Sequence, residues 1–186
     1  MAENFDETGL QLYFGVINEV NTIQDFIDHI SNKIENNRVK SYLQTFLQKK
    51  QELEQVYNIE NQLYSPRFTI DIGQDEQGEP YIFQYFIKKI KSWNHYCLYI
   101  SIPANHPLYG KNCDEIQDAT YACFDIEDPG RWVFGWDYAH FNILTFANIY
   151  MYYETNPAAL LDLQIITIDT IQKDVYDYIN ILAGNH

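Results

Sequence analysis

The spacing of apolar and polar residues predicts helices at both ends of the chain and strands in between. From Asn21, apolar residues recur at the 3.6-residue period of an amphipathic helix, and a second stripe of this kind follows. The polar segment NNR at residues 36–38 separates the stripes, so we predict an antiparallel helical hairpin over residues 21–58, with Asn21 or Thr22 as its first cap. Residues 1–18 contain a mixture of acidic and apolar residues, and we interpret them as an arm or a short strand.

Residues 67–140 carry the period-two alternation that is typical of β-strands. RFTIDI is followed by a loop with Gly and Pro and then by YIFQYFIKKI, an order that favours a hairpin. YCLYISIP, ATYACFDIE and RWVFGWDY are three further strand-like runs. The five runs predict an antiparallel sheet, and the residues we expect to be mostly buried are Phe68, Ile70, Leu98, Ile100, Trp132, Phe134 and Trp136.

The C-terminal part of the chain predicts one closing helix. FNILTFANIYMYYET fits a helix or a strand equally, whereas Asp169 stands three residues before Gln172 and ahead of apolar residues at helical spacing. This capping-box pattern predicts a helix over about residues 170–183. The fold class is therefore α+β, with an N-terminal helical hairpin, a central antiparallel sheet and a C-terminal helix. We predict a helical region at residues 1–62 and an α+β core at residues 63–186.

The net charge of the chain limits the classes of partner that it is expected to bind. With 12 basic and 26 acidic residues the formal net charge is −14, which disfavours direct binding to a nucleic-acid backbone. It is compatible with a basic protein partner, such as a nucleic-acid-binding protein whose groove this chain would occupy. Solubility alone is a second explanation of the charge. A homodimer also stays open, because the helical hairpin would either cover a sheet or pair with another copy.

Cysteine usage and hydropathy indicate an intracellular protein without a bound cofactor. The three cysteines include no CxxC pair and the histidines show no HxH or HxxxH spacing, so we expect no disulfide framework and no metal site. The N-terminal MAENFDETGL lacks the regions of a secretion signal, and no apolar run is long enough to span a membrane. We expect a cytoplasmic protein with no membrane partner and no cofactor.

The stretch GRWVFGWDYAH holds the main candidates for chemistry. In a strand, Trp132, Trp136 and the other aromatic residues share one face, while small residues and Asp137 share the other and let a neighbour pack closely. His106, Asp137 and His140 have the residue types of a metal site or a general acid–base pair. In the structural alternative, His106 fixes its turn and Asp137 hydrogen-bonds backbone groups at the strand end.

The segment at residues 112–137 is the best candidate for a docking surface toward a basic partner. It contains seven acidic side chains against Arg131 alone. The residues we expect to bind the partner are six of these acids and two tryptophans, namely Asp114, Glu115, Asp118, Asp125, Glu127, Asp128, Trp132 and Trp136.

HPLYGK, followed some 25 residues later by WVFGWDYAH, resembles a family of small proteins of bacteriophages and other mobile elements of gut Firmicutes. The family patterns are HPLYGxxY(D/E)(D/E)(I/L) and (W/F)xxGFDxAH before a closing helix, and the match covers roughly Tyr96–His140 plus the terminal helix. ATYACFDIE stands where the family often has a Gly-rich HGGLTY-like strand, and FNIL stands where Gly-Asp usually follows the histidine. A family ligand site built on those residues would be degraded or lost here.

This resemblance implies a phage or mobile-element origin, and small acidic proteins of that origin are often inhibitors of host defence, as anti-CRISPR proteins are. From this association we expect an inhibitor of a host defence effector in the cytoplasm of a bacterial cell. The expected partner is a basic, nucleic-acid-binding effector such as a CRISPR nuclease, inhibited by occupation of its basic surface. The alternative is a small hydrolase or nuclease in which Asp137 binds a metal or orients an imidazole, and His106 or His140 transfers the proton. A phage protein whose acidity serves only solubility is the third possibility.

Overall fold

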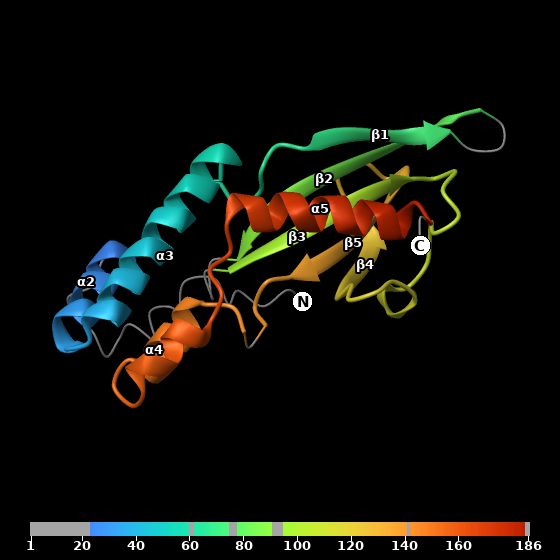
Figure 1. Cartoon of the computed structure of the whole chain (residues 1–186). Helices are drawn as coiled ribbons and strands as arrows, with labels where there is room; N and C mark the ends of the chain where they lie inside the picture. Colours follow the sequence, from blue (N-terminus) through green and yellow to red (C-terminus); the bar gives the residue numbers. More distant parts are fainter. Residues whose placement is uncertain (1–22, 60–61, 75–77, 91–94, 141, 185–186) are drawn as a thin grey trace. The chain divides into compact units, whose positions relative to one another are not determined.

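A computed structural model describes residues 23–59, 62–74, 78–90, 95–140 and 142–184, and it confirms the α+β class. Helices α2 (Ile23–Lys33) and α3 (Asn37–Val56) precede strands β1 (Phe68–Gln74), β2 (Pro80–Ile90) and β3 (His95–Pro103). The short helix η1 (Cys113–Glu115), strands β4 (Tyr121–Phe124) and β5 (Arg131–Asp137), and helices α4 (Phe146–Tyr152), η2 (Pro157–Asp162) and α5 (Ile168–Leu182) follow (Figure 1).

The chain forms two compact units that are interleaved along the sequence. One contains residues 1–56, 90–95 and 139–167, and the other contains residues 57–89, 96–138 and 168–186. The sequence pattern predicted a single boundary after residue 62. The structure groups the residues differently because α4 and η2, far along the chain, pack with the N-terminal helices.

The first unit is helical, and its core is made of apolar residues from α2, α3, α4 and η2. The predicted helical hairpin is confirmed as α2 and α3, and Asn36 caps α3 by accepting hydrogen bonds from the backbone N–H of Arg38 and Val39. Phe146 of α4 packs edge-on against Phe46, with ring centroids 5.4 Å apart. The fully buried residues of this helical core include Ile27, Ile30, Val39, Leu43, Ile149 and Leu160.

The second unit is built on one five-stranded sheet with the strand order β1-β2-β3-β5-β4. Strand β1 pairs with β2, and β5 pairs with both β3 and β4. These pairs are all antiparallel, as predicted. In the central pair, Cys97 lies opposite Asp137 and Pro103 lies opposite Arg131. This pairing places the apolar residues of β3 beside those of β5 in the middle of the sheet.

Helix α5 lies across one face of this sheet (Figure 1). The ring of Tyr178 stacks on Trp136, with centroids 4.2 Å apart, and the hydroxyl of Tyr138 donates to Asp174. Of the residues predicted to be buried, Leu98, Ile100, Phe134 and Trp136 are almost fully buried, whereas Phe68, Ile70 and Trp132 are half-buried. The predicted alternation of β5 therefore holds, with its aromatic residues on the α5 side.

Two details of the predicted elements change. Helix α5 begins at Ile168, so Asp169 lies in its first turn, where a carboxylate is favoured by the helix dipole. The ambiguous segment after residue 140 forms α4, which Thr145 caps in a box with Asn148. The predicted arm at residues 1–18 and the caps Asn21 and Thr22 lie outside the described residues.

None of the helices in the described part of the chain combines the length and the apolar character that crossing a membrane requires.

On the face of the sheet opposite α5, aromatic side chains pack closely against Gly135. Tyr99 stacks on Phe86, with centroids 5.1 Å apart, and meets Tyr121 edge-on at 5.7 Å. A Cβ atom added at Gly135 would lie 2.7 Å from Cε1 of Tyr99, closer than real Cβ contacts come. Because two aromatic neighbours hold the Tyr99 ring, it has little room to move aside.

We therefore expect Gly135→Ala to lower the free energy of unfolding by about 1–3 kcal/mol, the range of overpacked sites. Gly130→Ala is the matched control, since its nearest neighbour, Oδ1 of Asp128, would be 3.6 Å away. Chemical denaturation of both variants measures the difference. Equal stability of the two variants would contradict the packing described for Tyr99.

Candidate functional site

Asp125, predicted to bind a partner, is instead the centre of a buried polar network on the face of the sheet opposite α5. Its carboxylate accepts two hydrogen bonds from the guanidinium of Arg67, at 2.6 and 2.8 Å, and one from Oγ of Ser101. Arg131 donates to Oγ of Ser101 and to the carbonyl of Ile82. Burial alone would raise the pKa of Asp125, but the hydrogen bonds from Arg67 and Ser101 outweigh it, so that the pKa is lowered.

This network gives Asp125 a structural role. The side chain is buried and its oxygens also accept from the backbone N–H of Glu127 and Asp128, which shapes the turn after β4. The sequence window of residues 112–137 contained Arg131 as its only base, but the fold adds Arg67 from outside that window. Asp125 is therefore not free to meet a partner.

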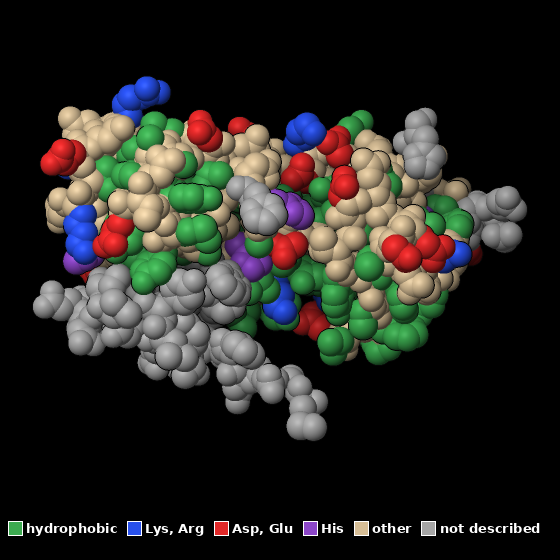
Figure 2. All heavy atoms as spheres, turned by 90° about the horizontal axis from the view of Figure 1, so that it is seen from below, with side chains coloured by type: hydrophobic (Ala, Val, Ile, Leu, Met, Phe, Trp, Pro, Cys, Tyr) green, Lys and Arg blue, Asp and Glu red, His purple; other side chains and the backbone are tan. Residues whose placement is uncertain are grey.

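The other predicted acidic residues are exposed, and some are paired. Glu115 forms an ion pair with Lys111, at 2.9 Å, and Glu127 forms one with Arg67, at 3.1 Å. Asp114, Asp118 and Asp128 are exposed as well. Figure 2 shows acidic side chains at several separate places on the face seen from below, so the charge there is distributed and does not form one continuous patch.

Strand β4 lies at one edge of the sheet. Two exposed apolar side chains of this strand, Tyr121 and Phe124, which point to opposite faces of the sheet, and Ile126 just after the strand make up what we call the β4 edge surface. Their exposed fractions are 42%, 58% and 88%. Phe124 also packs edge-on against Trp132, with centroids 4.8 Å apart, and Tyr109 contacts both rings. Glu127 and Asp128 follow Ile126 directly, so acids flank the apolar residues.

The two tryptophans predicted to bind the partner differ in their positions. Trp132 is half-buried, and its Nε1–H donates to the carbonyl of Lys111, which ties the 105–118 loop to the β4 edge surface. Trp136 is buried beneath Tyr178 and donates to the carbonyl of Gln117. Trp136 thus belongs to the core of the second unit, and only Trp132 lies next to the surface.

His106 is a buried part of the core, not an exposed acid–base group. Its ring packs edge-on against Tyr81 and Phe83, and its Nδ1 accepts a hydrogen bond from the backbone N–H of Leu108. Burial lowers the pKa of His106 to about 4, and a hydrogen bond to the backbone of Leu182 opposes this only in part. The imidazole is therefore neutral at pH 7 and fixes its turn against the end of α5.

The structure does not bring the three predicted catalytic residues together. Asp137 lies opposite Cys97 near the start of β3, whereas His106 follows the other end of β3, beyond Pro103. Six residues of extended strand between Cys97 and Pro103 correspond to roughly 20 Å. His140 is exposed and belongs to the other unit. A direct acid–base pair of His106 and Asp137 does not exist in this fold.

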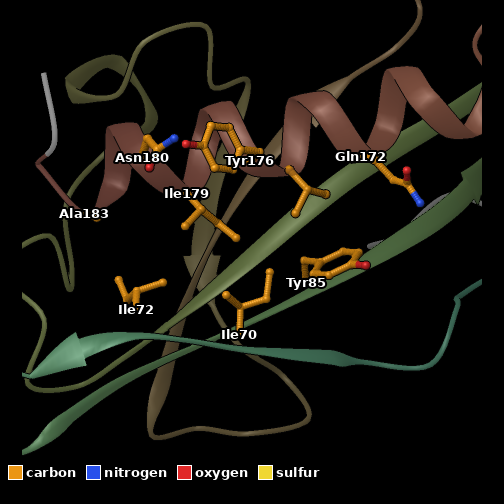
Figure 3. Close-up of a pocket in the computed structure, with 9 residues that line it drawn as sticks. Ile70, Ile72, Tyr85, Gln172, Tyr176, Ile179, Asn180 and Ala183 are labelled. Atoms are coloured by element: carbon orange, nitrogen blue, oxygen red, sulfur yellow. The ribbon is translucent and has the colours of Figure 1, made fainter.

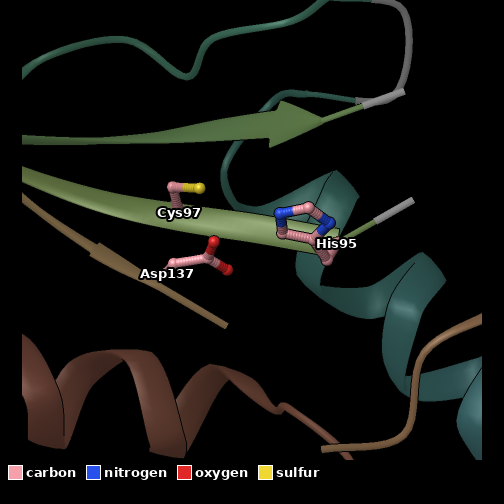
Figure 4. A group of neighbouring side chains, drawn as sticks. All are labelled: His95, Cys97 and Asp137. Atoms are coloured by element: carbon pink, nitrogen blue, oxygen red, sulfur yellow. The ribbon is translucent and has the colours of Figure 1, made fainter. Parts of the chain in front are cut away.

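Asp137 instead lies beside His95 and Cys97, which were not among the site residues predicted from the sequence. His95 and Cys97 stand two residues apart on the same face of β3, and Asp137 is the register partner of Cys97 on β5. One ligand atom from each of these three side chains lies within 4.8 Å of the other two (Figure 4). The spacing of cysteines and histidines in the sequence, from which we expected no metal site, did not indicate this grouping of His95, Cys97 and Asp137.

The thiol of Cys97 is in an apolar and anionic environment. Burial, and then the charge of Asp137, raise its pKa to about 12, and a hydrogen bond with Tyr99 and the charge of Lys88 oppose this only in part. The thiol is thus protonated at pH 7 when nothing else is bound to it.

The second unit has a groove between β1, β2 and α5 (Figure 3). It has a volume of about 450 Å³ and an apolar floor of Ile70, Ile72, Val175 and Ile179. Uncharged polar side chains, among them Gln172 and Asn180, complete its lining. No Asp, Glu, Lys or Arg lines the groove, so it offers no charged group for recognition or catalysis.

The buried imidazole of His106 predicts a pH-dependent stability. An unfolded histidine has a pKa of about 6.5, above the folded value of about 4, so the stabilisation is complete above pH 6.5 and is lost as the pH falls from 6.5 toward 4. We expect the advantage in unfolding free energy of wild type over His106→Gln to shrink by about 1–2 kcal/mol between pH 7 and pH 5.

His140→Gln is the matched control, because His140 is exposed. Urea denaturation at both pH values gives the two differences, and the difference for His140→Gln should stay constant. A wild-type advantage over His106→Gln that is the same at pH 5 and pH 7 would contradict a buried neutral ring.

No family model, no curated protein and no solved structure matches this chain. The resemblance to a phage protein family therefore stays a prediction, and function has to be inferred from the geometry of the described residues.

Proposed function

We propose that this protein acts by binding a partner protein through the β4 edge surface. The observation that carries the proposal is the exposure of Phe124 and Ile126 at the end of an edge strand, with 58% and 88% of their surface exposed. Apolar side chains that stay exposed in a folded chain are typical of interaction sites when they adjoin one another. Aromatic anchors of this kind contribute most of the affinity of protein interfaces.

The charges around the β4 edge surface favour a basic partner. Glu127 and Asp128 follow Ile126, and the loop that Trp132 ties to this edge carries the exposed acid Asp114. The net charge of −14 would add long-range attraction to a cationic surface and raise the association rate. Asp125 is excluded from the contact because Arg67 neutralises it inside the fold.

The partner class we propose is a nucleic-acid-binding effector of host defence, in the cytoplasm of a bacterial cell. What supports this class is the charge of the chain and the resemblance of HPLYGK and WVFGWDYAH to proteins of phages and mobile elements. In this proposal the exposed carboxylates occupy the positions of phosphates on the basic groove of the effector. Inhibition follows from occupation of the groove, without any reaction.

A pair of double variants tests the surface. Phe124→Ser with Ile126→Ser removes the proposed anchors, and Tyr176→Ser with Met151→Ser removes two other exposed apolar side chains as a control. Each tagged protein is used to capture partners from the host cell, and the partner found with wild type is purified for titration. We expect the first pair to weaken binding more than about tenfold, equal to about 1.4 kcal/mol, and the control to change it less than about twofold.

A series of salt concentrations tests whether the acidic residues attract the partner. We expect the association rate of wild type to fall between about 50 and 300 mM salt, and the triple variant Asp114→Asn, Glu127→Gln, Asp128→Asn to show a weaker dependence. Nucleic acid should compete for the same partner. An acidic partner, a partner bound equally by the Phe124 and Ile126 double variant, or a salt-independent rate would each contradict the proposal.

A further inference from the structure

We propose that His95, Cys97 and Asp137 form a binding site for one transition metal ion of the zinc type. Among the described residues these three side chains form the cluster of His, Cys, Asp or Glu whose ligand atoms lie within 4.8 Å of one another. The site is separate from the β4 edge surface, and the proposal does not depend on partner binding.

The backbone places the three ligands in one location. Because side chains two apart in a strand point to the same side, His95 and Cys97 share a face of β3. The antiparallel register puts Asp137 directly opposite Cys97, on that same face. Figure 4 shows the imidazole, the thiol and the carboxylate directed toward a common space. The division of the chain into two units falls after His95, but His95 and Cys97 are held at this spacing by one continuous strand.

The distances suit a small ion after a slight adjustment. Tetrahedral zinc binds at about 2.0–2.3 Å, so two of its ligand atoms are roughly 3.3–3.8 Å apart. Ligand atoms that lie within 4.8 Å of one another would need to move closer by about 1 Å to bind the same ion. His95 and Cys97 are buried and Asp137 is half-buried, so the ion would be largely shielded from water.

The donor types select the metal. A thiolate and an imidazole suit Zn²⁺ and its neighbours in the transition series, whereas Ca²⁺ and Mg²⁺ require mostly oxygen ligands. One imidazole nitrogen, one sulfur and one carboxylate oxygen give three protein ligands. This is the number that catalytic zinc sites use, with a water or substrate atom in the fourth position, while structural sites use four protein ligands.

Titration with Co²⁺ tests the site, because a thiolate bound to Co²⁺ gives an intense charge-transfer band in the near ultraviolet. The full-length protein, treated with chelator and then titrated, should develop this band at a stoichiometry of one, and Zn²⁺ should displace it. We expect Cys97→Ser to abolish the band. His95→Gln and Asp137→Asn should each weaken Co²⁺ and Zn²⁺ binding by more than about tenfold, the lower limit for losing even an outer-shell partner.

Three changes of the same residue types elsewhere serve as controls, namely Cys123→Ser, His140→Gln and Asp128→Asn, and each should leave the affinity within about twofold of wild type. Peptide mapping of the wild type after alkylation provides a test without variants. Zn²⁺ should slow the alkylation of Cys97 and leave the rates of Cys113 and Cys123 unchanged. A missing band, a band that persists in Cys97→Ser, or equal protection of all three cysteines would overturn the proposal.

Discussion

The pairing of β3 with β5 is the constraint on which the rest of the sheet unit depends. Its register sets Leu98 against Trp136 and Ile100 against Phe134 on the α5 side, and these four side chains are almost completely buried. Each contributes roughly 1.5–3 kcal/mol through burial of apolar surface. A slip by one residue would turn all of them to the other face, so the apolar face alone fixes the register firmly. A single buried ion pair such as Arg67 with Asp125 adds little net stability by comparison, although losing one partner would destabilise the fold.

The same register determines which side chains lie next to one another on the face of the sheet opposite α5. It sets Ser101 near Arg131 in the network that holds Asp125, and it brings Cys97 opposite Asp137 beside His95. Further along the sheet, β5 pairs with the short edge strand β4, which leaves Phe124 and Ile126 exposed. The proposed partner surface and the proposed metal site are thus separate consequences of one pairing. The first depends on β4 as the edge strand, and the second on the start of β3.

Local patterns were sufficient for the fold class and for most elements, because period and capping residues are properties of short segments. They also predicted that small residues on β5 let a neighbour pack closely, as Tyr99 does on Gly135. The candidate sites required contacts between distant segments, which no local pattern encodes. Arg67 reaches Asp125 from 58 residues away, so the sequence window made Asp125 look like a free acid. The spacing of His95 and Cys97 on one strand was a usable signal, but Asp137 joins them only through the register.

A cross-strand disulfide tests that register most directly. The backbone N–H of Tyr138 donates to the carbonyl of Tyr96, so the neighbouring pair of Cys97 and Asp137 is not hydrogen-bonded, with Cα atoms about 4.5 Å apart. That separation lies inside the disulfide range. In protein carrying Cys113→Ser, Cys123→Ser and Asp137→Cys, mild oxidation should join Cys97 to the introduced thiol, as peptide mapping would show. With Asp128→Cys in place of Asp137→Cys, Cys97 should stay reduced. A folded Asp137→Cys protein whose Cys97 remains reduced would contradict the register and the account built on it.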